Sequence, residues 1–146
     1  RLQQDSDTTV RDGMDMALCV IDPNKKELRF AGAKNPLFYV REGQVTEIKG
    51  DKFPIGGGIY KNQTKFSSTT IDVKKGDSVF FCSDGFPDQF GGPQGKKFKY
   101  RPFKDLLLEV HERPMEEQHK ILSLIFDEWK GDLSQIDDVL VIGLRL

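Results

Sequence analysis

The order of the apolar segments constrains the fold of this chain more than any other feature. Short apolar and β-branched runs come first, separated by turn signals such as Asp22-Pro23-Asn24-Lys25. Two segments with helical periodicity follow, and a last apolar run closes the chain. Strands that do not alternate with helices disfavour a Rossmann-like fold. The sequence predicts an α+β fold, a mainly antiparallel sheet with helices packed on one face.

Seven strands are expected from these apolar runs. They cover residues 14–21, 27–33, 37–40, 44–48, 66–73, 78–82 and 139–146. The first is interpreted as a buried strand, and the short connections up to residue 48 predict an antiparallel meander. Residues 53–58, Phe-Pro-Ile-Gly-Gly-Gly, predict a close-packed turn. A phosphate-cradling loop is the alternative there, but no Lys-Ser/Thr pair follows the glycines.

Two helices are expected between the sixth and seventh strands. The first places Phe103, Leu106, Leu107 and Val110 on one face. The second begins at Pro114 and ends at Gly131, residues suited to the start and the end of a helix. Its buried face is expected to carry Gln118, Leu122, Ile125 and Trp129.

Size and charge narrow the class of protein. A chain of 146 residues predicts a single domain over 1–146, with the polar residues 1–12 as a loop or frayed start. The net charge of −1 argues against nucleic-acid or anionic-membrane partners. The chain has neither a membrane-span run nor a signal-peptide pattern, so we expect a cytoplasmic location, or the cytoplasmic part of a larger sensor protein. Cys19 and Cys82 lie in apolar strand patterns, lack metal-site spacing and are expected to be buried free thiols.

Two aspartate motifs carry most of the functional information. Ser83-Asp84-Gly85 follows the strand at 78–82, and Asp137-Asp138 precedes the last strand. If those strands are antiparallel neighbours, the carboxylates converge at one sheet edge, where hard oxygen ligands suit Mg²⁺ or Mn²⁺. The alternative is that Asp-Gly marks a turn and Asp-Asp the solvated start of a strand, which is the better account of either motif alone.

Other hydrolytic chemistries have less support. His111 and His119 fall in helical segments, and no Gly-x-Ser-x-Gly turn is present, which disfavours a nucleophilic triad. Their spacing of eight residues also does not suit a shared metal. Acid–base work on glycosides by Asp84 and Asp137 would need apolar surroundings that a polar Asp-Gly loop does not provide.

The segment 96–104 combines five cations with three aromatic residues. A solvated loop before a helix is a better account than a single-strand nucleic-acid platform, which nothing else in the chain supports, and a basic flap beside a metal site is the third interpretation. The last agrees best with the aspartates. In that interpretation Lys97 and Arg101 are the candidate substrate-binding residues for a phosphorylated substrate.

Residues 14–146 resemble the later part of a bacterial PPM-type metal-dependent serine/threonine phosphatase, in the subgroup of stage II sporulation protein E. The matching segments occur in family order at 15–22, 31–37, 53–56, 76–78, 81–85 and 135–139. The resemblance implies part of a PPM-type α/β sandwich. It also implies hydrolysis of phosphoserine or phosphothreonine by a metal-activated water, without a protein nucleophile.

The resemblance also assigns roles to individual residues. It implies that Asp84 and Asp137 ligate a binuclear Mn²⁺ or Mg²⁺ centre, with Asp138 as a neighbour that orients them. The implied substrate is a phosphorylated regulator of the anti-anti-sigma type, in bacterial signal transduction that controls a sigma factor. An incomplete sheet would expose an edge, so we also expect a homodimer.

One family motif has no counterpart in the chain. The Asp-x-Ser/Thr-Gly-His-Gly or Asp-Gly motif, which supplies the aspartate that bridges both metals, is missing, and Asp12-Gly13 is interpreted as a loop. We therefore expect the C-terminal portion of a longer phosphatase domain, inactive on its own. The alternative is a non-catalytic binding or dimerisation module that has a phosphatase-like fold.

Overall fold

The computed structural model describes residues 13–56 and 65–146. The chain divides into two compact units. The first comprises Arg1–Leu37 and Ile48–Val73, and the second Phe38–Glu47 and Lys74–Leu146. Among the described residues, no helix is both long and apolar enough to cross a membrane.

A three-stranded antiparallel sheet forms the first unit, with β3 (Glu27–Ala33) between β2 (Met16–Asp22) and β7 (Thr69–Asp72). β2 and β3 form the expected hairpin, with Met16 opposite Ala33 and Asp22 opposite Glu27. The Asp22 carboxylate closes the turn by accepting the backbone N–H groups of Asn24 and Lys25 at 3.0 and 3.1 Å. The predicted turn and hairpin are confirmed.

The rest of the first unit differs from the expected turn at 53–58. β1 (Gly13–Met14) pairs with β6 (Ile55–Gly56) in a two-stranded antiparallel sheet. Phe53 is buried, and its ring centroid lies 4.6 Å from that of Phe66. Gly57 and Gly58 lie outside the described residues.

The expectation that the first strand is buried was wrong. Leu18 and Val20 on β2 are 53% and 46% exposed, and Cys19 is half-buried. Within the described residues, β2 pairs along one side only, with β3, and these side chains point to the faces of the strand, which are left largely uncovered. β7 is also shorter than the expected strand at 66–73, because only Thr69–Asp72 pair with β3.

A four-stranded sheet forms the base of the second unit, in the order β11 (Val141–Arg145), β8 (Ser78–Cys82), β4 (Leu37–Arg41), β5 (Gln44–Ile48). β4 and β5 are joined by Glu42 and Gly43, which both have positive φ, as a two-residue type I′ hairpin requires. The expected single meander was wrong in one respect. β2 and β3 hydrogen-bond in one sheet, whereas β4 and β5 belong to another.

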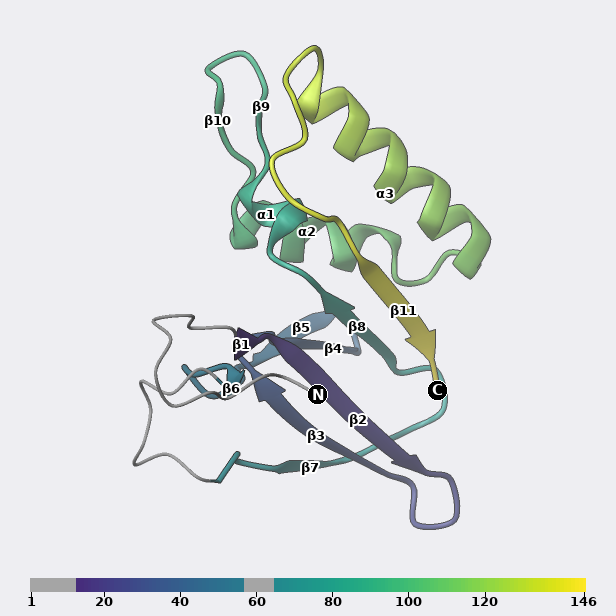
Figure 1. Ribbon diagram of the computed structural model, residues 1–146. Coiled ribbons are helices and arrows are strands. Elements are labelled where there is room, and N and C mark those ends of the chain that lie inside the picture. The colour runs from purple at the N-terminus through teal and green to yellow at the C-terminus, as the bar shows by residue number, and fades with distance from the viewer. Residues whose placement is uncertain (1–12, 57–64) are drawn as a thin grey trace, which may run out of the picture. The chain divides into compact units, whose positions relative to one another are not determined.

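Two long helices cover one face of this sheet (Figure 1). They are α2 (Tyr100–Val110) and α3 (Met115–Lys130). The second is preceded by Pro114 at its N-cap and closed by Gly131 at φ +53°. Between β8 and α2 lie a short helix, α1 (Gly85–Asp88), and a hairpin of β9 (Phe90–Gly91) and β10 (Lys96–Lys97). The α+β fold class is confirmed.

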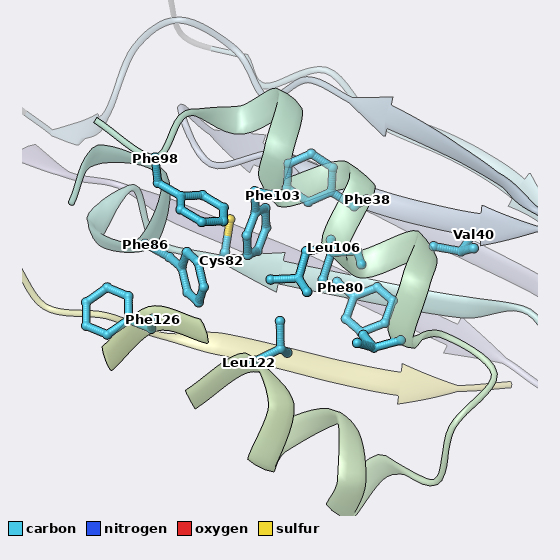
Figure 2. Packing of buried hydrophobic residues seen from close by; sticks show 12 residues of the cluster. Phe38, Val40, Phe80, Cys82, Phe86, Phe98, Phe103, Leu106, Leu122 and Phe126 are labelled. Atoms are coloured by element: carbon cyan, nitrogen blue, oxygen red, sulfur yellow. The ribbon is translucent and has the colours of Figure 1, made fainter. Parts of the chain in front are cut away.

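An aromatic cluster joins these helices to the sheet (Figure 2). The ring of Phe86 lies 5.0–5.1 Å from the rings of Phe98, Phe103 and Phe126. Alternate residues of β4 and β8 face the same cluster, namely Phe38, Val40, Phe80 and Cys82. The predicted apolar face of α2 is also buried in it, with Phe103, Leu106, Leu107 and Val110. This core fixes α1, and therefore the segment in which Asp84 lies.

A buried carboxylate links β4 to β8. The Asp77 side chain accepts a hydrogen bond from the Tyr39 hydroxyl at 2.5 Å and two from the Arg41 guanidinium at 2.6 and 3.0 Å. The backbone N–H of Lys74 donates to it at 2.6 Å. Burial of Asp77 opposes its ionisation, but these hydrogen bonds outweigh that effect and lower the pKa of Asp77 to about 2.

Candidate metal centre

The pairing of β8 with β11 brings the two aspartate motifs together. The strands are antiparallel, and Cys82 lies opposite Val141 at the end of the paired region. Just beyond that pair, the backbone N–H of Ser83 donates to the carbonyl of Leu140 at 3.0 Å. The expectation that the end of one strand lies beside the start of the other is confirmed.

The Ser83 side chain extends this contact to the Asp-Asp motif. Its Oγ donates to the carbonyl oxygen of Asp138 at 2.8 Å and accepts the backbone N–H of Leu140 at 3.0 Å. One hydroxyl therefore satisfies two backbone groups, one in the Asp-Asp motif and one two residues after it, using both its donor and its acceptor capacity.

Gly85 permits the backbones to approach this closely. A Cβ atom at Gly85 would lie 2.3 Å from the carbonyl oxygen of Asp138 and 3.2 Å from Cγ2 of Val139. The first distance is impossible for a side chain unless the backbone moves. The glycine of Ser-Asp-Gly is therefore a packing requirement of this site.

The Asp84 carboxylate lies at the N-terminal end of α1. Asp84 is exposed, and its carbonyl accepts the backbone N–H of Asp88 at 2.8 Å. Although Asp84 occupies the N-cap, its side chain makes no capping hydrogen bond. The carboxylate is therefore not occupied in capping the helix.

Asp137 and Asp138 are both exposed on the segment that leads into β11. The Oδ1 of Asp137 accepts the backbone N–H of Asp138 at 2.7 Å, and the Asp137 carbonyl accepts a hydrogen bond from the Gln135 side chain at 2.8 Å. These local bonds fix the turn that presents both carboxylates.

The donor chemistry of this site fits Mg²⁺ or Mn²⁺, because Asp84 and Asp137 offer hard carboxylate oxygens. Across residues 13–56 and 65–146, however, no group of three or more His, Cys, Asp or Glu side chains is arranged to hold a metal ion. Asp12 lies outside the described residues. Among the described residues, Asp84 and Asp137 therefore do not form a complete metal-binding group.

The basic segment lies beside α1. Lys97 on β10 forms an ion pair with Asp88 at 2.8 Å, and its Nζ lies 5.8 Å from the centroid of the Phe90 ring. Arg101 is exposed in the first turn of α2. The segment is not the solvated loop weighed above, because it includes β10 and the start of α2, and Phe98 within it is buried.

Backbone hydrogen bonds hold this segment to the end of α1. The N–H of Phe98 donates to the Gln89 carbonyl at 2.9 Å, and the N–H of Lys99 donates to the Pro87 carbonyl at 2.7 Å. The segment that carries the cations of β10 and α2 is therefore attached to α1, whose N-cap is Asp84.

Tyr100 is a residue near the site that the sequence did not reveal. Burial raises the pKa of its hydroxyl, and the neighbouring groups of Cys82, Asp84 and Asp88 raise it further. The Tyr100 phenol is therefore neutral at physiological pH, and it lies near the carboxylates of Asp84 and Asp88. The available signal is an aromatic residue among the cations of 96–104, which the sequence pattern associates only with a nucleic-acid platform.

A family model described as stage II sporulation protein E (SpoIIE) matches residues 1–146, the whole chain. No curated protein matches the chain significantly. Among solved structures, the SiaA-PP2C domain of Pseudomonas aeruginosa is similar, with 31% identity and a TM-score of 0.83. The match covers 90% of this chain and 51% of that domain.

Two further structures share the fold at lower identity. The PP2C phosphatase domain and a regulatory-domain fragment of the cell fate determinant SpoIIE from Bacillus subtilis is 21% identical with a TM-score of 0.71, over 90% of this chain and 37% of that one. A Mycobacterium tuberculosis structure of RsbU and RsbW domains is 18% identical with a TM-score of 0.69, over 90% and 35%. The chain thus spans about half or less of these relatives. It belongs to the stage II sporulation protein E (SpoIIE) family, and its fold is that of PP2C phosphatase domains.

Proposed function

We propose that this chain is the C-terminal part of a cytoplasmic, metal-dependent protein serine/threonine phosphatase. The observation that supports it most is the contact between Ser83 and Asp138, which places the two aspartate motifs of the family side by side. Asp84 and Asp137 would hold Mn²⁺ or Mg²⁺, and Asp138 would orient them. A fold without catalysis would not require both exposed carboxylates at one junction.

The bound ions would supply a hydroxide at neutral pH and neutralise the phosphoryl oxygens. The residues of this chain hold their carboxylates in place through the backbone of α1 and of the segment before β11. The described residues provide only part of the ligand set. We therefore propose that the binuclear centre and full activity require ligands from the remainder of the family's domain.

The proposed substrate is a phosphorylated regulatory protein of the anti-anti-sigma type, in a bacterial pathway that controls a sigma factor. This substrate class is the one that the resemblance to the stage II sporulation protein E family implies. Lys97 and Arg101 would attract the phosphorylated region, since both are exposed cations next to α1.

A second candidate is a non-catalytic binding or dimerisation module. The absence of a three-residue metal cluster from the described part of the chain favours it. Exposed apolar residues on the edge strands, such as Leu18 on β2 and Ile142 on β11, also suit a homodimer contact. The two candidates differ in whether the aspartates are needed for function.

The test is Mn²⁺-dependent phosphate release from a phosphoprotein by the full-length protein, compared with its Asp84→Asn and Asp137→Asn variants. We expect each variant to lose at least about 100-fold in turnover, because changes around metal sites already cost 10–100-fold when they affect only outer partners. Asp105→Asn, which changes an exposed carboxylate on α2, is the matched control. Wild-type turnover in the Asp84→Asn and Asp137→Asn variants would overturn the assignment in favour of the binding module.

A further inference from the structure

We propose that Gln89 is a positioning residue for the metal site, acting on Asp137 through the backbone on its N-terminal side. This inference rests on the proposed function, because it concerns how the proposed ligand Asp137 is held. Gln89 is not itself a ligand, and nothing in the residue pattern of the sequence singled it out.

Gln89 is fully buried where α1 ends, with 0% of its surface exposed. A buried amide side chain is costly unless its donors and acceptor find partners. The partners of the Gln89 side chain are backbone groups of two segments, one at the end of α1 and one before Asp137, so its hydrogen bonds hold those segments together.

The Gln89 side chain links α1 to the segment before Asp137. Its Nε2 donates to the carbonyls of Phe90 at 2.9 Å and of Ser134 at 3.0 Å. Its Oε1 accepts the backbone N–H of Ile136 at 3.4 Å. Two of these three bonds span more than forty residues and end on the residues just before Asp137.

Together with Ser83, Gln89 forms a two-point clamp. Ser83, immediately before Asp84, holds the backbone of Asp138 and Leu140. Gln89, at the other end of α1, holds Ser134 and Ile136. Asp137 lies between the two attachment points, so its position relative to Asp84 depends on both.

The helix α3 supports Gln89 from the other side. The indole Nε1 of Trp129 donates to the Gln89 carbonyl at 3.0 Å, and the N–H of Gly92 donates to the Trp129 carbonyl at 2.7 Å. A Cβ atom at Gly91 would lie 1.8 Å from that same carbonyl oxygen, so the chain fits closely here. Gln89 is therefore fixed in place, and its hydrogen bonds to Ser134 and Ile136 hold the segment before Asp137 in turn.

The chain contains a matched control. Gln118 on α3 is also buried, at 2% exposure, and its Nε2 also donates to two backbone carbonyls, those of His111 and Arg113 at 3.1 and 2.8 Å. These carbonyls belong to the connection between α2 and α3. Gln118→Leu therefore removes a buried amide whose two hydrogen bonds end on that connection, although the Oε1 of Gln118, unlike that of Gln89, has no hydrogen-bond partner among the described residues.

The experiment uses the full-length protein as wild type, Gln89→Leu, Gln89→Asn and Gln118→Leu. Gln89→Asn keeps the amide group but shortens the side chain by one methylene. It therefore tests whether the amide must reach Ser134 and Ile136, with less change in polarity than Gln89→Leu. Mn²⁺ affinity is measured by titration of the free-ion electron paramagnetic resonance signal. Amide hydrogen exchange is measured over residues 134–140.

We expect both Gln89 variants to bind Mn²⁺ about tenfold or more weakly, as found for residues that orient metal ligands, and to exchange faster over 134–140. Gln118→Leu is expected to lose stability while keeping wild-type Mn²⁺ affinity and exchange in that segment. Wild-type Mn²⁺ binding in the Gln89 variants, or an equal loss in Gln118→Leu, would overturn the inference alone. If the wild-type protein binds no Mn²⁺, the proposed function and this inference fall together.

Discussion

The hydroxyl of Ser83 lies 2.8 Å from the carbonyl oxygen of Asp138, although 55 residues separate them in the chain. This single contact joins the two motifs that define the proposed metal site. It depends on the antiparallel register of β8 and β11, which places Cys82 opposite Val141. The geometry of the proposed site therefore depends on the pairing of β8 with β11.

Replacement of Ser83 by Ala tests that contact directly. The change removes one donor and one acceptor and leaves two backbone groups, the carbonyl of Asp138 and the N–H of Leu140, without this partner. We expect a loss of about 1–3 kcal/mol in the free energy of unfolding and weaker Mn²⁺ binding. Urea denaturation and Mn²⁺ titration measure the two effects. Ser123→Ala on the exposed side of α3 is the control, and an unchanged Mn²⁺ affinity in Ser83→Ala would contradict the role of Ser83.

Gly85→Ala is expected to displace the Asp138 backbone, because the added Cβ would lie 2.3 Å from its carbonyl oxygen. We expect a stability loss of about 1–3 kcal/mol from this overpacking, together with weaker Mn²⁺ binding. Gly95→Ala is the comparison, since an added Cβ there meets no atom within 4 Å although φ is +58°. It should cost stability through backbone strain alone. Equal Mn²⁺ affinity in the two variants would argue against the close approach at Gly85.

Asp77→Asn is expected to destabilise the second unit by about 2–3 kcal/mol, because it removes the charge of a buried carboxylate that accepts hydrogen bonds from the partly buried Arg41. Asp77 is the shared acceptor for Tyr39, Arg41 and the backbone of Lys74. Urea denaturation at pH 7 measures the loss, with the exposed Asp105→Asn as the control. A difference below about 0.5 kcal/mol, the range of ordinary surface changes, would show that the network contributes little.

The same residue predicts a pH dependence. The pKa of Asp77 falls from 3.8 to about 2 in the folded protein, so the folded state favours the ionised form. The stability from this group is present above pH 3.8 and is lost as the pH falls toward 2. We therefore expect the stability difference between wild type and Asp77→Asn to shrink between these values. A constant difference over the range would contradict the assignment.

The two cysteines are expected to differ in reactivity toward thiol reagents, which attack the thiolate. Burial raises the pKa of Cys82 to about 12, with the carboxylates of Asp84 and Glu47 adding to the effect. Burial also raises the pKa of Cys19, but that thiol is only half-buried on the edge strand β2. Labelling with a chromogenic disulfide at pH 8 should modify Cys19 first and Cys82 only on unfolding. Cys19→Ser should abolish the early reaction, whereas rapid labelling in that variant would show that Cys82 is accessible.

Lys97→Ala combined with Arg101→Ala is expected to raise KM for a phosphoprotein several-fold while leaving kcat little changed. Both cations are exposed beside α1 and would attract an acidic phosphorylated region. Steady-state kinetics with a phosphoprotein and with a small aryl phosphate separate the effects, because only the former reaches an extended basic surface. Lys120→Ala, an exposed lysine on α3, is the control. A loss in kcat for both substrates would indicate that these cations act at the reacting centre.

Local sequence patterns predicted several elements residue for residue. The strands β3, β5 and β8 match the expected runs at 27–33, 44–48 and 78–82. They do so because turn residues with positive φ or carboxylate caps, such as Gly43, Gly76 and Asp22, stand at their ends. The apolar face of α2 was predicted for a similar reason, since its periodicity lies within eleven residues.

Sheet membership and burial could not be predicted in this way. The sequence shows an unbroken series of strands up to residue 48, but β3 and β4 belong to different sheets. The exposure of Leu18 depends on what packs against that face of β2, which the run of apolar letters does not encode. Both properties depend on contacts between segments that are distant in the sequence.

The sequence by itself determined the α+β class, most strands and helices, and the pair of aspartate motifs, because each of these depends on residues close together in the chain. The tertiary structure alone decided that Ser83 contacts Asp138 and that Gln89 contacts Ser134, across 55 and 45 residues. Hydrogen bonds of this kind form only after β8, β11 and α1 have packed. The role of Gln89 therefore cannot be predicted from the sequence, because its hydrogen-bond partners are distant in the chain and adjacent only in the folded protein.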